Sequence, residues 1–175
     1  GNSKNLEVRA GARIQAFRLY DLKRLDIFAR VEFDNFDRPC FPTRGIRFTV
    51  GGDAYPHKSD GFAALNVQFG GVIPVSRKFA FIASLDHRGM SDRNGEIPLV
   101  YANWMGGVQQ GRYFDQQFAF CGFNHAYLFG DVLTSLNLDA RANFGKKHYL
   151  TLSGAYALDG ATYRTMFDGR STFGA

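Results

Sequence analysis

The sequence predicts an all-β protein, an antiparallel up-and-down transmembrane β-barrel of which this chain carries about seven to eight strands. The clearest pattern lies at residues 132–144, where apolar residues occupy one parity and polar residues occupy the other. Alternate side chains of a strand point to opposite faces, so this segment has one apolar face and one polar face. It also exceeds the roughly 9–11 residues that a tilted strand needs to cross a bilayer. An apolar outside and a polar lumen are typical of membrane barrels.

Composition argues against a membrane-spanning helix. The chain has 175 residues, of which 45% are hydrophobic, but mean hydropathy is only −0.22. Its longest apolar runs, such as 79–83, fall far short of the roughly 18 residues that a spanning helix needs. Only helices and closed barrels satisfy their backbone groups in lipid, so a membrane protein with this sequence has to be a barrel. The 18 Phe, 8 Tyr and 20 Gly residues suit strands and turns.

Period-two alternation recurs along the chain and sets the expected strands. They cover residues 8–16, 24–34, 46–51, 62–69, 78–86, 132–144 and 148–158, and an eighth strand begins near Ser171. No stretch keeps a helical period over three turns. In the second strand the apolar set is expected to face lipid and the polar set the lumen. The apolar set is Leu25, Ile27, Ala29, Val31 and Phe33, and the polar set is Arg24, Asp26, Arg30 and Glu32.

The connections differ in length between the two ends of the strands. Short turns are expected at 35–44, 73–77 and 145–147, and longer polar loops at 55–61 and 159–170. Such asymmetry is typical of outer-membrane barrels. The one long connection, residues 89–126, is expected to enter the lumen, because its glycines allow close backbone approach to the wall. No domain boundary is visible, so we expect residues 1–175 to be part of one barrel domain.

The main alternative is a soluble β-barrel that binds an apolar ligand, because its strands alternate in the same way. Net charge is +5, but the basic residues are dispersed, and a nucleic-acid partner is not expected. Cys40 and Cys121 form no CxxC pair; they are most simply two free thiols, with a disulfide between them as the alternative. The four histidines lack metal-ligand spacing. The sequence thus predicts no catalytic, cofactor or metal site.

One connection carries a recognisable motif. Asp34 is followed by Phe41-Pro42 and then by Gly45, which resembles the D-x-x-x-x-x-x-F-P-x-x-G turn of the bacterial surface antigen superfamily of outer-membrane assembly factors. The resemblance implies that Pro42 and Gly45 tighten a periplasmic turn. It also implies a barrel of roughly sixteen strands, of which this chain is a middle-to-late piece. The absence of a signal peptide at the start of the sequence fits this expectation.

The long connection adds to the resemblance. In the family, a Gly-Gly pair opens a segment that folds into the lumen and docks through an Arg-Gly-aromatic tip. Here the pair is Gly106-Gly107, and the tip is replaced by Gly111-Arg112-Tyr113. The resemblance thereby implies that Arg112, Gly106 and Gly107 dock this loop on the wall of the barrel. The continuation at 115–122 is most similar to the C-terminal barrel of patatin-like phospholipases.

The resemblance implies a membrane anchor that translocates or inserts a polypeptide in the bacterial outer membrane. The expected partners are outer-membrane lipid, the remaining strands of the barrel or another copy, and a polypeptide cargo. Patatin-like enzymes pair a G-x-S-x-G serine with a D-G-[GA] aspartate. Asp159-Gly160-Ala161 matches the second motif, but the first does not occur, so we expect an ordinary turn there and no enzyme. A lipase domain would belong to the rest of the full-length protein.

Overall fold

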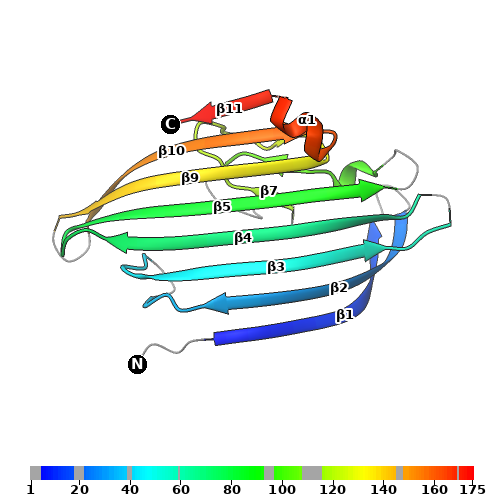
Figure 1. Cartoon of the computed structure of the whole chain (residues 1–175), viewed down its shortest axis with the longest axis horizontal. Helices are drawn as coiled ribbons and strands as arrows, with labels where there is room; N and C mark the ends of the chain where they lie inside the picture. The colour runs from blue at the N-terminus through cyan, green and yellow to red at the C-terminus, as the bar shows by residue number, and fades with distance from the viewer. Residues whose placement is uncertain are drawn as a thin grey trace.

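The computed structural model describes residues 5–17, 22–38, 41–58, 60–92, 97–107, 116–144, 148–168 and 170–175. Eight strands form one antiparallel sheet in the order β1-β2-β3-β4-β5-β9-β10-β11. Figure 1 shows these strands side by side, with the amino terminus at the β1 edge and the carboxyl terminus at the β11 edge. The predicted all-β, antiparallel fold and its number of strands are confirmed.

The strands are long, as the alternation predicts. Their bounds are β1 Asn5–Phe17, β2 Leu22–Asp34, β3 Gly45–Tyr55, β4 Phe62–Pro74, β5 Phe79–Asp92, β9 Val132–Asn143, β10 Tyr149–Gly160 and β11 Arg170–Gly174. Strands β1 to β5 pair consecutively, and β5 pairs with β9 across the long connection. The strands β1, β2, β4 and β5 have 13, 13, 13 and 14 residues, which is longer than most strands of soluble proteins.

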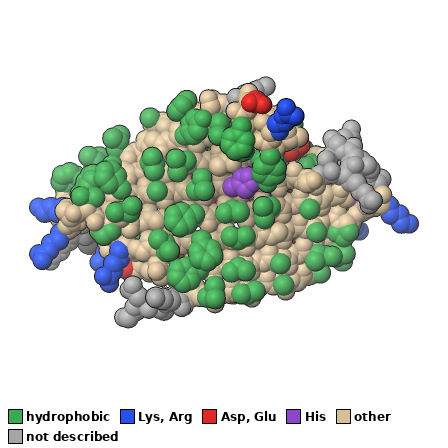
Figure 2. Space-filling model, viewed as in Figure 1, with side chains coloured by type: hydrophobic (Ala, Val, Ile, Leu, Met, Phe, Trp, Pro, Cys, Tyr) green, Lys and Arg blue, Asp and Glu red, His purple; other side chains and the backbone are tan. Residues whose placement is uncertain are grey.

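The two faces of the sheet have different chemistry. On β2, Leu25 and Ile27 are 43% and 47% exposed, whereas Arg24 and Asp26 are 4% and 0% exposed. These four side chains divide between the two faces as predicted, although Arg30 of the predicted lumen set is exposed; that the apolar face lies in lipid stays a prediction. We call the face that carries Ile27 the outer face and the face that carries Asp26 the inner face. Figure 2 shows the outer face covered with hydrophobic side chains, while Lys and Arg gather toward the ends of the strands.

The long connection contains structure that the alternation does not predict. A 3₁₀ turn, Leu99–Tyr101, precedes a small sheet of three two-residue strands in the order β7-β6-β8. These strands are β6 Trp104–Met105, β7 Gln117–Phe118 and β8 Tyr127–Leu128. Two-residue strands are too short to show a period in the sequence. We call residues 97–107 and 116–131 the inner segment, because they pack on the inner face, as described below.

A short helix, α1 Tyr163–Asp168, corrects the expectation of a loop throughout 159–170. Thr162 and Thr165 form a reciprocal cap at its start, since each side-chain oxygen accepts a backbone hydrogen bond from the other residue, at 3.2 and 2.9 Å. One and a half turns cannot establish a helical period, which explains why the sequence pattern missed it. Within the described residues, no helix is long and apolar enough to cross a membrane.

Other boundaries also shift. Strand β5 extends to Asp92, so the connection begins later than the predicted residue 89 and continues to Asp131. Strand β4 extends to Pro74, which leaves 75–78 as the turn. Proline closes the strand there because it has no N–H to donate to a continuing ladder.

Candidate functional site

The inner face carries a buried carboxylate at the β1–β2 pair. Asp26 is fully buried, and its Oδ2 accepts hydrogen bonds from Arg13 Nε at 2.5 Å and from Gln15 Nε2 at 3.0 Å. Arg13 and Asp26 are direct cross-strand partners, so the register brings opposite charges together. A buried charge is tolerated when it is paired and hydrogen-bonded in this way.

A second ion pair joins the inner face to a loop. Arg24, which is 4% exposed, donates to the carboxylate of Asp60 and, at 3.0 Å, to its backbone carbonyl. The guanidinium also lies 5.7 Å from the centre of the Phe62 ring. The inner face is thus built for charged and polar contacts rather than for an apolar ligand.

Arg88 of β5 binds the inner segment to the sheet. This arginine is 4% exposed, and its Nη1 donates to the carbonyl of Tyr101 at 2.7 Å and to Oδ1 of Asn103 at 2.9 Å. Asn103 is fully buried, and its Nδ2 donates to the carbonyl of Gly130 at 2.8 Å. One arginine on the sheet therefore orders both the start and the end of the inner segment.

Apolar contacts complete this packing. One cluster joins the fully or almost fully buried Met105, Phe118 and Phe120 of the inner segment to Leu133, Ala155 and Ala157 of the sheet. A second cluster joins Tyr101 to Tyr55 and Phe62 near the loop end. The ring centres of Tyr55 and Tyr101 are 4.7 Å apart. The inner segment is therefore held on the inner face by two apolar anchors and one buried arginine.

The Gly106-Gly107 pair shapes the small sheet. Both residues have positive φ, +138° and +75°, which side chains rarely tolerate. A Cβ on Gly106 would lie 2.0 Å from the carbonyl oxygen of His125, and Gln117 Nε2 donates to the Gly106 carbonyl at 2.6 Å. These close approaches lie within the inner segment. The sequence predicts instead that these glycines let the backbone approach the barrel wall. The role of the pair in docking the connection on the wall stays a prediction.

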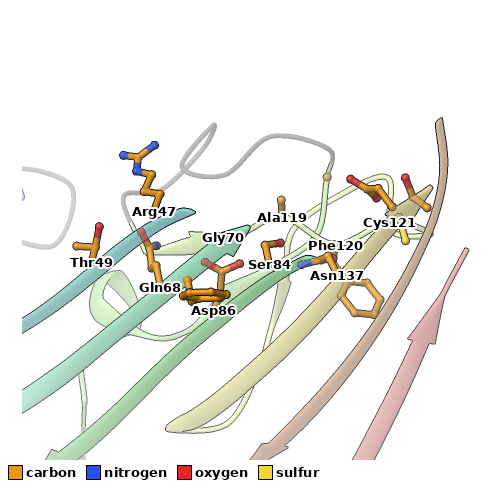
Figure 3. A pocket seen from close by; sticks show the side chains of 14 residues that line it. Arg47, Thr49, Gln68, Gly70, Ser84, Asp86, Ala119, Phe120, Cys121 and Asn137 are labelled. Atoms are coloured by element: carbon orange, nitrogen blue, oxygen red, sulfur yellow. The ribbon is translucent and has the colours of Figure 1, made fainter. Parts of the chain in front are cut away.

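A polar pocket of about 560 Å³ lies between the inner face and the inner segment. Figure 3 shows Gln68, Asp86 and Asn137 on strands of the sheet, with Phe120 and Cys121 of the inner segment lining the same pocket. Its lining also includes Arg47 and Asp139, so both signs of charge are present. Burial raises the pKa of the Cys121 thiol, which keeps it protonated at neutral pH and a poor nucleophile. This pocket can hold water and polar groups.

The Asp34–Gly45 motif folds into a closely hydrogen-bonded turn. Asp37 Oδ1 accepts hydrogen bonds from the backbone N–H groups of Thr43 at 2.8 Å and Arg44 at 3.2 Å. Asn35 Oδ1 accepts one from the N–H of Ile46 at 2.6 Å. Gly45 has φ +118°, and a Cβ there would lie 2.7 Å from the carbonyl oxygen of Asn35. Only glycine fits this position without strain.

This turn also reaches across the sheet. Arg141 of β9 donates to the carbonyl of Pro42, and the ring of Phe41 stacks on Tyr149 of β10 with centres 5.0 Å apart. The Arg141 guanidinium lies 5.7 Å from the Tyr149 ring centre. The turn between β2 and β3 is thereby fixed to β9 and β10, which lie at the other side of the sheet.

The predicted site residues fall into two groups. Pro42 and Gly45 lie in the ordered turn just described, and Gly106 and Gly107 lie in the inner segment. Arg112 lies outside the described residues, and its docking role stays a prediction. Cys40 also lies outside them, whereas Cys121 is a free thiol.

The sequence interpretation missed Arg88, although a signal was present. The polar parity of β5 runs on from Ser84 through Asp86 to Arg88, but the sequence interpretation ended this strand at residue 86 and so left Arg88 out. Asn103 gave no signal, because a polar residue in a connection is ordinary. In the described part of the chain, no group of His, Cys, Asp and Glu side chains could hold a metal ion.

The comparisons with known proteins agree with the antiparallel all-β fold. A family model of the OMP85 superfamily matches residues 4–168. No curated protein and no solved structure shows a significant match. The match covers almost the entire sheet, from β1 to α1, and OMP85 proteins are outer-membrane assembly and transport proteins. The chain belongs to the OMP85 superfamily and contributes strands of an outer-membrane β-barrel.

Proposed function

We propose that this chain is the translocating and anchoring part of a surface antigen or patatin-type protein. In this proposal the outer face lies in lipid of the bacterial outer membrane, and the inner face lines the lumen. The observation that supports it best is the pairing of an apolar outer face with a charged inner face that carries its own packed segment. A passive anchor needs only the outer face. The charged inner face suits a path for polar polypeptide.

The inner segment would then regulate this path. It is held by Arg88 and by two apolar clusters, so it occupies the lumen when no polypeptide passes. The turn that contains Pro42 and Gly45 would lie on the periplasmic side, where cargo enters. The patatin-type assignment is supported by the resemblance of residues 115–122, of which the structure describes 116–122.

The soluble β-barrel is the second candidate, and the geometry favours it less. An apolar ligand would need an apolar interior, yet the inner face carries buried Arg24, Asp26, Asp53, Asp86 and Arg88. The outer face would also expose many large apolar side chains to water, among them Leu138 at 54% and Leu152 at 75%. Soluble proteins rarely expose so continuous an apolar surface.

The test is surface display in a Gram-negative host. The full-length protein is expressed with and without residues 1–175, and the domains outside this chain are followed by protease treatment of intact cells. If the proposal holds, those domains stay with the outer membrane and reach the surface only when this chain is present. Equal surface exposure without the chain would contradict translocation. Equal membrane attachment without it would contradict anchoring.

A further inference from the structure

A pocket that the proposed function does not use lies at the end of the sheet that carries the short turns. Its volume is about 460 Å³, which is large enough for a small ligand. It is formed by the turn at 35–44, the turn at 75–78 and the adjoining ends of β9 and β10. Three segments that are far apart in the sequence thus meet around one space.

Among the described residues, the charged side chains that line this pocket are all cationic. They are Arg38, Arg44, Arg77, Lys78 and Arg141. Of these, Arg38 lies 3.9 Å from Asp37, and Arg141 donates to the Pro42 carbonyl. No ion pair joins Arg44, Arg77 or Lys78 to a carboxylate within the described residues. The larger pocket differs, because its lining contains the carboxylates of Asp86 and Asp139 as well as Arg47.

Clustered cations without counter-charges repel one another, and an anion bound among them would remove this cost. Guanidinium groups favour phosphate, since they donate two parallel hydrogen bonds to its oxygens. The pocket also offers the hydroxyl of Ser76 as a further donor, whereas the Thr43 hydroxyl already donates to Asp37. Buried Asn143 Oδ1 has no hydrogen-bond partner among the described residues and can accept from a ligand hydroxyl.

Contacts between the turns and the strands fix the position of the pocket. Arg141 is 7% exposed, and its contact with Pro42 holds the turn at 35–44 above β9. The stack of Phe41 on Tyr149 holds the same turn above β10. The backbone N–H of Asn143 donates to the Lys78 carbonyl at 2.7 Å, which fixes the turn at 75–78 against β9.

We propose that this pocket binds a phosphate group, supplied either by an anionic phospholipid headgroup or by free phosphate in the adjoining water. Both sources present the same anionic phosphate oxygens to the cationic side chains of the pocket. The pocket volume leaves room for the substituent that a phosphodiester carries. This site is independent of polypeptide translocation, so it stands whether or not the proposed function does.

The test uses the full chain reconstituted in neutral phosphatidylcholine bilayers, in whatever assembly it forms there. Inorganic phosphate is titrated by calorimetry into the unaltered chain, into Arg44→Gln/Arg77→Gln, and into the control Lys58→Gln/Arg164→Gln, which removes two exposed cations at the opposite end. We expect saturable binding that the first variant weakens by roughly tenfold or more and the control leaves unchanged. Folding of each variant is checked by its circular dichroism. Arg141 is left intact because it holds the turn.

A second arm separates the two sources. Bilayers that contain phosphatidylglycerol replace the neutral ones, and retained lipid is counted by native mass spectrometry. Retention of phosphatidylglycerol that the Arg44→Gln/Arg77→Gln variant loses would support the site with lipid as its source. Phosphate binding without such retention would support it with free phosphate as the source. Absence of both, or equal loss in the control variant, would overturn the proposal.

Discussion

Arg88 Nη1 lies 2.9 Å from Asn103 Oδ1, and through this contact a strand of the sheet holds the segment that covers its inner face. Both side chains are buried, so neither atom can exchange its partner for water. Removal of the arginine would leave the Asn103 amide oxygen and the Tyr101 carbonyl unpaired. Such buried acceptors are expensive to leave unsatisfied.

The first prediction follows from this contact. Arg88→Met should destabilise the packing of the inner segment by about 2–4 kcal/mol, because two hydrogen bonds from a charged donor are lost. Trp104 is the only tryptophan and lies in the segment, so its emission should shift to the red and cleavage near it should accelerate. Arg30→Met is the control, since Arg30 is an exposed arginine of the inner face on β2. Identical spectra for both variants would show that Arg88 does not hold the segment.

A second prediction concerns the turn motif. Gly45→Ala should destabilise the sheet by roughly 1–3 kcal/mol, because the new Cβ would meet the Asn35 carbonyl and the backbone is in the left-handed region. Gly154→Ala should cost little, since nothing lies within 4 Å of a Cβ there. Urea midpoints of the two variants in the same bilayer measure the difference. A Gly45 variant as stable as the Gly154 variant would refute the account of the turn.

The third prediction concerns pH. Burial opposes ionisation of Asp37, but hydrogen bonds from Thr43 and Arg44 outweigh it and lower the pKa of this carboxyl below its ordinary value of 3.8. Ionised Asp37 therefore stabilises the folded turn. This contribution is complete above pH 3.8 and is lost as pH falls through the lowered pKa.

Hydrogen exchange at the Thr43 and Arg44 amides measures this effect. In the unaltered chain, protection of both amides should fall as the pH is lowered through this acidic range, after correction for intrinsic exchange. Asp37→Asn should show weaker protection at neutral pH and no such acid transition. If the variant keeps the acid transition, another group is responsible for it.

A fourth prediction follows from the two edges of the sheet. Strand β1 is paired along its full length with β2, and β11 pairs with β10, so each presents one unpaired edge in the described structure. Lipid cannot satisfy these N–H and C=O groups. The isolated 175-residue chain in detergent should therefore pair edge to edge or aggregate. Size-exclusion chromatography with light scattering tests this, and a monodisperse monomer would contradict it.

Much of the sheet was predictable because its information is local. Alternation on β2 and β9 assigns each side chain to a face, and in a sheet with one apolar face a shift by one residue would reverse every assignment. The turn at 35–45 was predictable for a similar reason, since Gly45 and the neighbouring polar residues act on backbone groups within the same turn. On these strands and in this turn, the sequence pattern and the structure agree.

The remainder depends on contacts that no local pattern encodes. The contact of Arg141 with Pro42 joins residues 99 positions apart, and the contact of Arg88 with Asn103 depends on how the connection folds back. The two-residue strands of the inner segment exist only through their pairing with one another, and their own residues show no strand pattern. Helix α1 is too short to establish a helical period. The turn expected at Asp159-Gly160 is wrong, because both residues pair with β9 at the end of β10. These features require the tertiary structure.

The central claim is that the outer face lies in lipid and the inner face in water. Nitroxide labels placed singly along β9, at positions 135 to 140 in a chain without its native cysteines, test it most directly in bilayers. We expect oxygen to relax labels at 136, 138 and 140 more strongly, and a water-soluble nickel complex to relax those at 137 and 139, while the buried position 135 is shielded from it. Leu138 should show the strongest contrast with Asn137. Uniform accessibility to the nickel complex at all six positions would contradict the membrane barrel.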